Sequence, residues 1–126
     1  LYIYLFTLAL CSCKRPLCEE TDVSNLSINT FFETPSFSWV GSNINSLIVH
    51  GPSGEELWTL SCQGSSLCIP SPIEYGTLPA EMIEELTAAP ASAPDLSSGE
   101  TYSLEISIKC RGGARNITQE EMFEAP

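Results

Sequence analysis

Residues 101–110 read TYSLEISIKC, and along this stretch apolar and polar side chains alternate without a break. Successive side chains of a β-strand point to opposite faces, so alternation of this length predicts a strand with one buried face. The expected buried face holds Tyr102, Leu104, Ile106, Ile108 and Cys110, and the expected solvent face holds Thr101, Ser103, Glu105, Ser107 and Lys109. The stretch therefore predicts an all-β fold class.

Shorter segments on the N-terminal side alternate in the same way, at residues 36–40, 46–50 and 56–62. Residues 51–54 read GPSG, a dense turn signal, so the second and third segments predict a hairpin. Residues 26–32 and 116–123 are weaker strand candidates. The side chains expected to point inward from the three clearer segments are Phe37, Trp39, Leu47, Val49, Trp58 and Leu60.

Residues 80–88, AEMIEELTA, do not show the strand pattern. They are good helix formers and follow Pro79, which suits the first turn of a helix, so composition alone predicts a short helix. The prolines of residues 88–95, AAPASAPD, would end that helix.

A turn motif stands directly before the long strand. Residues 96–102 read LSSGETY and fit L-x-x-G-x-x-Y, with Leu96, Gly99 and Tyr102 at the fixed positions. The motif resembles the tyrosine corner of fibronectin type III and related immunoglobulin-like domains, in which the tyrosine hydroxyl bonds to backbone a few residues upstream. Residues 37–39, FSW, are similar to the second strand of that family, whose tryptophan, here Trp39, packs in the core. The resemblance covers about residues 24–124 and implies an immunoglobulin-like antiparallel β-sandwich.

The chain also departs from that family. Trp39 and Tyr102 lie 63 residues apart, which is longer than a minimal domain requires, and the excess falls in residues 62–94. Disulfides are not typical of fibronectin type III domains. The resemblance implies an extended segment before the corner, and therefore a strand near residues 82–88 in place of the helix.

The N-terminal residues have the character of an export signal. Residues 1–10, LYIYLFTLAL, are apolar except for Thr7. Their length fits the apolar core of a signal peptide and falls short of the ~20 residues that span a bilayer. No methionine and no basic region precede them, so we expect the true start of the protein to lie further upstream.

A lipid attachment motif follows. Residues 10–13, LCSC, resemble a bacterial lipobox, with Leu10 at the aliphatic position, Ser12 at the small position and Cys13 as the residue that receives the lipid. Cys11 is unusual at the second position. Several acyl chains on one cysteine anchor a protein stably, whereas one chain does so only marginally. The alternative is an ordinary signal peptide with Cys13 in a disulfide.

These features divide the chain into a signal peptide (1–12), a lipidated cysteine with a polar tether (13–23) and a β-sandwich domain (24–126). We therefore expect an exported protein that is lipid-anchored in the bacterial cell envelope. Two N-x-S/T sequons, at Asn25 and Asn116, leave open a glycosylated eukaryotic ectodomain instead.

Six cysteines stand at positions 11, 13, 18, 62, 68 and 110. If the signal peptide and the lipid account for the first two, four remain, and an even number in an exported chain predicts disulfides. Of the three possible pairings, we favour Cys62–Cys68 because it closes a short flexible loop, and it leaves Cys18 with Cys110. A zinc site is the alternative, but the spacings lack CxxC and the chain has one histidine.

The charge balance is strongly acidic. Sixteen Asp and Glu against five Lys and Arg give a net charge of −11. Such a surface repels nucleic-acid phosphates and anionic lipid head groups, so we expect no nucleic-acid partner. It suits a cationic partner or divalent cations, although the simplest explanation is solubility.

Catalytic motifs are missing. Nucleophilic catalysis needs a base beside the nucleophile, and the only histidine, His50, ends a predicted strand, where an exposed or hydrogen-bonded histidine is usual. Acidic residues are too numerous for any one pair to indicate a glycosidase. We expect no enzyme activity, cofactor or metal, and a membrane-anchored interaction or structural module with an unidentified protein or glycan partner. The alternative is the accessory domain of a larger secreted enzyme.

Overall fold

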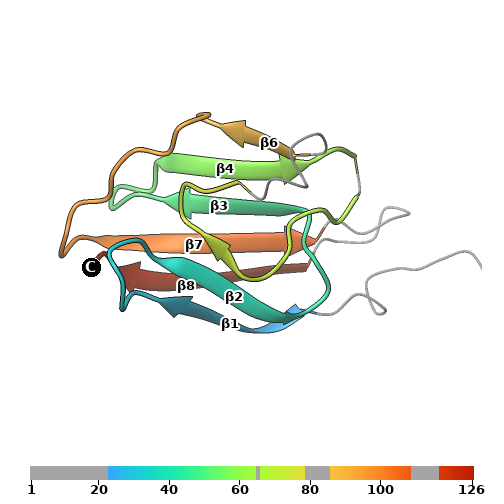
Figure 1. The fold of residues 1–126 in the computed structure, drawn as a ribbon, viewed down its shortest axis with the longest axis horizontal. Coiled ribbons are helices and arrows are strands. Elements are labelled where there is room, and N and C mark those ends of the chain that lie inside the picture. Colours follow the sequence, from blue (N-terminus) through green and yellow to red (C-terminus); the bar gives the residue numbers. More distant parts are fainter. Residues whose placement is uncertain (1–22, 65, 79–85, 109–116) are drawn as a thin grey trace, which may run out of the picture.

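The structure is a computed structural model that describes residues 23–64, 66–78, 86–108 and 117–126 (Figure 1). Within these ranges the chain forms strands and no helix, which confirms the all-β fold class. The predicted signal peptide, Cys13 and the tether as far as residue 22 lie outside the described residues. The strands are β1 (Val23–Asn29), β2 (Ser36–Gly41), β3 (Ser46–His50), β4 (Glu56–Cys62), β5 (Ile73–Glu74), β6 (Leu86–Ala89), β7 (Thr101–Ile108) and β8 (Ile117–Glu124).

The strands form two antiparallel sheets, with the orders β1-β2-β5 and β6-β4-β3-β7-β8. The smaller sheet lies across one face of the larger sheet, as in a β-sandwich (Figure 1). The predicted hairpin is present, because β3 pairs with β4 across the turn at residues 51–55. β7, which the sequence alternation predicted most clearly, pairs with β3 on one side and β8 on the other.

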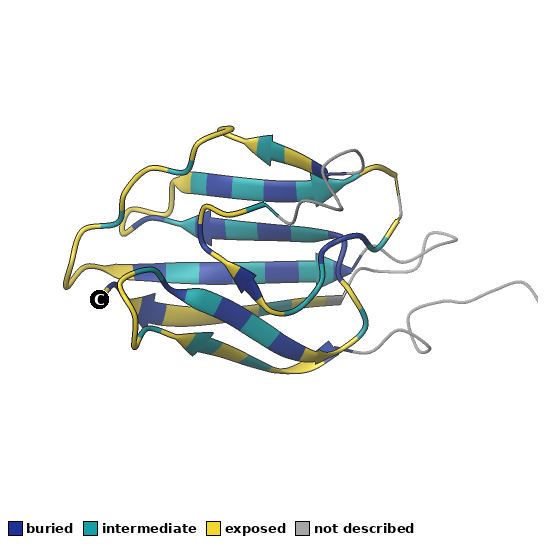
Figure 2. Ribbon diagram, viewed as in Figure 1, coloured by how far each residue is buried: buried dark blue, intermediate teal, exposed yellow. Residues whose placement is uncertain are grey.

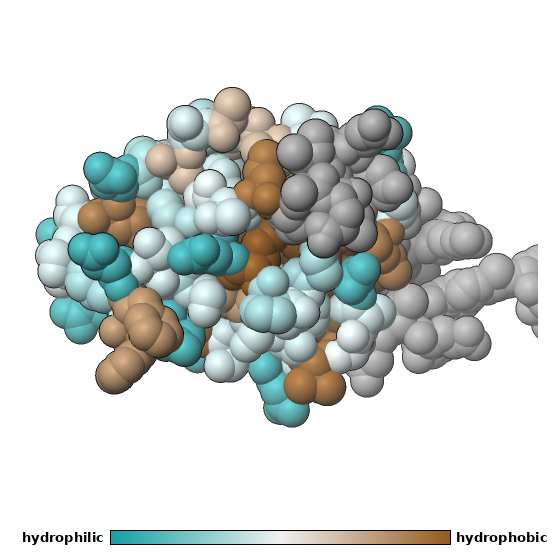
Figure 3. Space-filling model, in the orientation of Figure 1, coloured by the Kyte–Doolittle hydropathy of each residue, from teal (hydrophilic) through white to brown (hydrophobic). Residues whose placement is uncertain are grey.

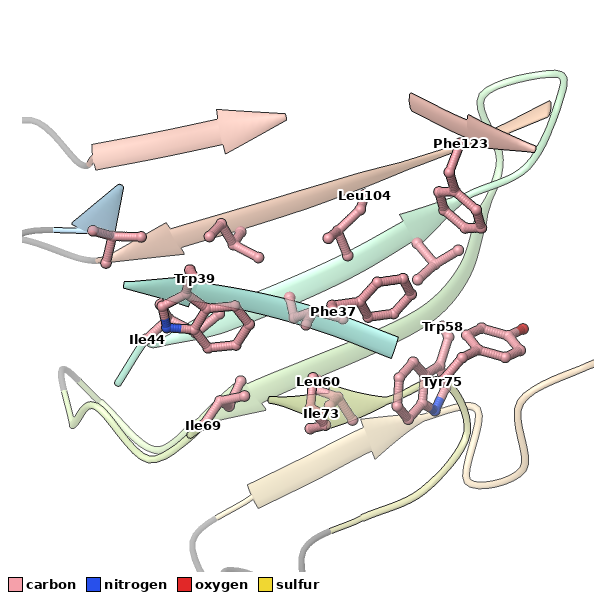
Figure 4. Close-up of a cluster of buried hydrophobic side chains, with 14 of the residues drawn as sticks. Phe37, Trp39, Ile44, Trp58, Leu60, Ile69, Ile73, Tyr75, Leu104 and Phe123 are labelled. Atoms are coloured by element: carbon pink, nitrogen blue, oxygen red, sulfur yellow. The ribbon is translucent and has the colours of Figure 1, made fainter. Parts of the chain in front are cut away.

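Burial follows the alternation of the sequence (Figure 2). In β7, Tyr102, Leu104, Ile106 and Ile108 are buried, and the residues between them are only partly covered. The inward side chains predicted for β2, β3 and β4 are also all buried. They form one apolar core between the two sheets, which contains Trp39 as well as Tyr102, and Figure 4 shows a large part of it. Burying one large apolar side chain of this kind contributes roughly 1.5–3 kcal/mol.

β1 starts and ends earlier than the predicted segment 26–32. Val23, which the sequence assigned to the tether, already pairs with Gly41. The strand ends at Asn29 because its side-chain oxygen Oδ1 accepts a hydrogen bond of 2.9 Å from the Phe31 N–H, which turns the chain.

β6 corrects the helix that composition predicted. Leu86–Ala89 pairs with β4, from Leu86 opposite Cys62 to Ala89 opposite Thr59. Pairing with β4 outweighs helix propensity here, and it buries the Leu86 side chain in the core. The strand implied near residues 82–88 is therefore present from Leu86 onward, and residues 79–85 lie outside the described part of the chain.

The sandwich has two different ends. The near end is the one where β1 begins, and the loop of residues 62–68 after β4 lies at the same end (Figure 1). There Gln119 Nε2 donates a hydrogen bond of 2.6 Å to the Val23 carbonyl, which ties β8 to the start of β1. The far end holds the β1–β2 loop (30–35), the β3–β4 turn (51–55), the β6–β7 connection (90–100) and the residues that follow β8 (Figure 1).

The edge strands carry features that hinder pairing with another chain. β1 has an irregular register around Asn25, whose φ is 55°. β8 exposes Glu120, Glu121 and Glu124 along the outer edge of the larger sheet. Charged and irregular edges discourage association between sheets of different molecules, so part of the acidic surface has a structural explanation.

Candidate functional site

Tyr102 lies at the start of β7, where its ring is buried and its hydroxyl reaches the chain before the strand. The hydroxyl oxygen accepts a hydrogen bond of 2.7 Å from the Ser97 N–H. Gly99 takes a φ of 85°, a conformation that favours glycine, and its N–H donates to the Ala125 carbonyl (3.0 Å). Leu96 is half-buried against the core. The bond between this hydroxyl and upstream backbone, which the sequence motif predicted, is present.

Tyr75 makes a second contact of the same kind, which the sequence did not predict. Its hydroxyl donates a hydrogen bond of 2.6 Å to the Pro94 carbonyl, and its N–H donates one of 3.0 Å to the Pro35 carbonyl. The ring packs edge-on against Trp58, with 5.1 Å between the ring centroids. Figure 4 shows the two rings side by side, with the tyrosine hydroxyl pointing away from the cluster.

The β6–β7 connection is therefore held at two points by buried tyrosines. The connection is largely exposed, and Tyr75 donates to it at Pro94 while Tyr102 accepts from it at Ser97. Burial, with smaller contributions from the nearby Tyr102 and Asp95, raises the pKa of Tyr75 to about 12. Tyr75 thus keeps its proton, and remains a donor, at any physiological pH.

A groove opens at the far end between the β1–β2 loop and the β6–β7 connection. Residues 33–35 line one wall, residues 93–96 the other, and Tyr75 with Gly76 lies between them. Residues 125 and 126, which follow β8, complete the lining. Each wall carries one carboxylate, Glu33 on the first and Asp95 on the second. Pro35 and Tyr75 are buried beneath the groove, so its exposed lining combines Pro94 and Pro126 with these two carboxylates.

Two exposed phenylalanines stand beside the groove on the β1–β2 loop. Phe31 is 85 % exposed and Phe32 is 64 % exposed. Their rings meet edge to face, with centroids 5.2 Å apart. Figure 3 shows apolar side chains projecting from this part of the far end, with hydrophilic side chains around them. Neither ring contributes to the core, so the pair is available for contact with another molecule.

Among the described residues, the charged side chains at this end of the sandwich are carboxylates. All Lys and Arg residues of the chain fall at positions 14, 15, 109, 111 and 115, outside the described residues. The described ranges therefore contain carboxylates and one histidine as their charged or chargeable side chains, apart from the tyrosines and the bridged cysteines. No group of three or more His, Cys, Asp or Glu side chains within those ranges is arranged to hold a metal ion.

A second hollow at the far end lies between the β3–β4 turn and the ends of β7 and β8. Met122, which is 69 % exposed, lines it together with Glu100, Glu120 and Glu121. This hollow shares the acidic character of the groove, but its one exposed apolar side chain has no aromatic neighbour of the kind that Phe31 and Phe32 provide.

His50 is hydrogen-bonded on the outer face of the larger sheet. Its Nε2 lies 3.0 Å from Glu105 Oε1, and its Nδ1 lies 3.4 Å from the Gly54 carbonyl oxygen. The hydrogen bond to Glu105 raises the pKa of His50 above its ordinary value. Ser103, the residue opposite His50 across the strands, donates instead to Glu120 (3.5 Å). The Ser103 hydroxyl is therefore not hydrogen-bonded to His50, as a serine nucleophile would be to its base.

The loop at the near end contains the predicted Cys62–Cys68 disulfide, with an S–S distance of 2.11 Å. Asn45, a polar residue that is only 6 % exposed, holds this loop from inside the fold. Its Nδ2 donates to the Gly64 carbonyl (3.2 Å) and to the Ser66 carbonyl (2.8 Å). Sequence reasoning missed Asn45, because Asn43 precedes the same strand and nothing in the local sequence distinguishes the two.

The predicted pairing of the other two cysteines, at positions 18 and 110, lies outside the described residues, as do the lipidation site Cys13 and the sequon at Asn116. Among the described residues, Asn25 of the other sequon is exposed. That part of the chain contains no helix long and apolar enough to cross a membrane.

Comparisons with models of protein families, with curated proteins and with solved structures found no match for this chain.

Proposed function

We propose that this protein is a non-catalytic interaction module of the bacterial cell envelope, held at a membrane by a lipid on Cys13 and binding its partner through the far end. The anchor is inferred from residues 1–13, in which an apolar segment precedes LCSC. A tether from Cys13 to residue 22 spans at most about 35 Å when fully extended, which is enough to hold a small domain clear of the head groups.

The polarity of the fold is the observation that carries this proposal. β1, the first strand after the tether, begins at the near end, whereas the groove and the exposed phenylalanines lie at the far end. A domain anchored through the residues before Val23 therefore turns its near end toward the membrane. The far end faces outward, where a partner can reach it.

The strand order supports an immunoglobulin-like type for the sandwich. In that fold strands A, B and E share one sheet, and strands G, F and C, extended in some members by C′, share the other. β1, β2 and β5 have the relationship of A, B and E, while β8, β7, β3 and β4 have that of G, F, C and C′. Tyr102 at the start of β7 corresponds to the corner tyrosine. β6 is the departure, because it extends the C′ edge yet follows β5, the E position, in the chain.

The chemistry of the described residues favours binding over catalysis. Both ring nitrogens of His50 have partners, the Gly54 carbonyl in the β3–β4 turn and Glu105 on β7. No described serine or cysteine is hydrogen-bonded to the ring as a nucleophile would be. The groove offers apolar surface and carboxylates that belong to exposed loops. Such a surface recognises a partner by shape and charge.

Metabolic labelling tests the anchor. The full-length gene is expressed in a Gram-negative host that is fed a clickable fatty acid, and the protein is purified and examined for label. We expect label on the wild type and on Cys11→Ser, and none on Cys13→Ser. Unlabelled wild-type protein, or equal label on Cys13→Ser, would show that the anchor is absent or lies elsewhere.

A further inference from the structure

Two of the exposed apolar side chains form a pair at the far end. In the described residues the large apolar side chains that are exposed are Phe31, Phe32, Val40 and Met122, and only the two phenylalanines contact each other. Single exposed apolar residues are common on protein surfaces. A pair of aromatic rings in contact at the tip of a loop is different, because aromatic residues, phenylalanine included, are enriched at the centres of protein interfaces relative to the rest of the surface.

The groove next to this pair is held in shape by one residue. Tyr75 donates through its N–H to Pro35 on one wall and through its hydroxyl to Pro94 on the other. Phe32 is followed directly by Glu33, the first residue of the wall that contains Pro35. The phenylalanine loop and the β6–β7 connection are thus fixed relative to each other before any partner arrives. A surface that is already arranged loses less conformational freedom when it binds.

The charge around the groove selects the chemistry of the partner. Glu33 and Asp95 face the groove from its two walls, and no Lys or Arg is present among the described residues to neutralise them. Nucleic acid and anionic lipid are repelled by such a surface, and the same surface of a second copy is repelled as well. Lys and Arg side chains are attracted to the carboxylates, and they also bind to the faces of aromatic rings.

We infer that the groove and the Phe31–Phe32 pair form one docking surface for a basic peptide segment of a partner protein, in which Lys or Arg lies next to an apolar side chain. The apolar side chain contacts the phenylalanines and the exposed prolines of the groove, Pro94 and Pro126. The basic side chains pair with Glu33 and Asp95. This inference rests on the proposed function in one respect, that the far end faces away from the membrane.

Selection from a library of short random peptides tests the inference. The full chain is held in a non-ionic detergent, so that binding does not depend on a membrane, and the enriched peptides are synthesised and measured by fluorescence anisotropy. We expect enrichment of Lys or Arg next to Phe, Leu, Ile or Pro. Affinity should fall as salt rises from low to physiological concentration, because the charges on both sides are exposed and screened.

Paired variants locate the binding surface. Phe31→Ser with Phe32→Ser should weaken the selected peptide by about tenfold or more, as loss of an interface anchor does. The matched control is Met122→Ser, which removes an exposed apolar side chain from the second hollow.

A second pair of variants tests the charges. Glu33→Gln with Asp95→Asn should weaken binding and reduce its dependence on salt, and Glu120→Gln with Glu121→Gln serves as the control with an equal change of charge. The thermal unfolding midpoint should change little in all four, because every substituted side chain belongs to an exposed residue.

Several outcomes would overturn the inference: a library without enriched peptides, peptides that lack basic residues, or binding that the phenylalanine variant leaves intact. Equal loss in the Glu120–Glu121 control would mean that the peptides respond to net charge alone, and equal loss in the Met122 control would mean that they do not select the Phe31–Phe32 pair; either result would overturn the inference. Self-association of the full chain that Phe31→Ser with Phe32→Ser abolishes would assign the surface to a second copy. Fatty-acid labelling of Cys13 is unaffected by any of these results, so failure of the docking surface and failure of the anchor can be told apart.

Discussion

Two connections between strands, one at each end of the sandwich, are held in place by different means. The loop after β4 is closed covalently by Cys62–Cys68, and buried Asn45 donates to two of its carbonyls. The β6–β7 connection has no covalent link, and the hydroxyls of Tyr75 and Tyr102 bond to its backbone at positions 94 and 97. A disulfide constrains the unfolded chain as well as the folded one, whereas the tyrosine hydroxyls act only once the core has formed around their rings.

This difference predicts that the two ends respond differently to substitutions. The near-end loop is closed by its own disulfide, is bonded by Asn45 and packs through Cys68 on the core at its own end, so it should keep its shape when the core at the far end is disturbed. The β6–β7 connection depends on two rings that belong to the core, and Tyr75 in turn packs against Trp58. The shape of the groove is thus coupled to packing around Trp58. Substitutions in this part of the core should loosen the β6–β7 connection more than the near-end loop.

The largest effect is expected from Trp58→Ala. Trp58 is 1 % exposed, and its loss should lower the free energy of unfolding by about 3–5 kcal/mol, since it leaves a large cavity. It also removes the ring against which Tyr75 packs. Amide exchange in residues 93–97 should therefore accelerate more than the loss of global unfolding free energy alone would cause. Urea unfolding and hydrogen exchange of the full chain measure both effects.

Trp39→Ala is the matched control, because Trp39 is also buried but bonds through Nε1 to the Ser42 carbonyl, away from Tyr75. It should destabilise the protein by a similar amount without a selective effect on residues 93–97. If the two variants loosen the β6–β7 connection equally, the coupling through Tyr75 is wrong.

Cys62→Ser combined with Cys68→Ser should have the next largest effect. Opening a loop of this length should cost about 2 kcal/mol in the chain-entropy account of disulfides. Hydrogen exchange should rise in residues 63–67 and stay unchanged in residues 93–97. Increased exchange at both ends would show that the two connections are not independent.

His50 offers the smallest effect and lies in neither connection. Its pKa is raised in the folded protein, so its bond to Glu105 stabilises the fold fully below the unfolded value of 6.5, and this contribution disappears as pH rises through the raised folded value. The difference in unfolding free energy between wild type and His50→Gln should therefore be larger at mildly acidic than at alkaline pH. A difference that is independent of pH, or that grows with pH, would contradict this assignment.

The sequence predicted those parts of the fold that depend on alternation, and it was less informative where distant segments meet. β7 and the β3–β4 hairpin were expected, because their inward side chains recur every second residue and a dense turn joins the hairpin strands. Helix propensity was misleading for Leu86–Ala89, because this segment forms backbone hydrogen bonds with the edge of β4, and a local sequence pattern does not reveal that pairing. β1 ends where the Asn29 side chain turns the chain, a local contact that periodicity does not reveal.

The candidate site was predicted only in part for the same reason. The motif L-x-x-G-x-x-Y indicated Tyr102 and its bond to backbone, since both partners lie in one short segment. Tyr75 bonds to Pro35 and Pro94, which are distant in the sequence, and no local pattern joins the three. Phe31 and Phe32 stood within the segment 26–32 predicted as a weak strand, so their exposure at a loop tip became evident only from the structure.

The most direct test of the account is hydrogen exchange at the Ser97 amide, which donates to the Tyr102 hydroxyl. In the full wild-type chain this amide should be protected, and in Tyr102→Phe it should exchange about two- to tenfold faster, because a part-buried hydrogen bond worth roughly 0.5–1.5 kcal/mol is lost. The Ile69 amide, which donates to the Ile44 carbonyl beside the disulfide, should keep its protection in both proteins. A Ser97 amide that exchanges as fast as unstructured chain in the wild type, or at the same rate in Tyr102→Phe, would contradict the claim that buried tyrosines hold the β6–β7 connection.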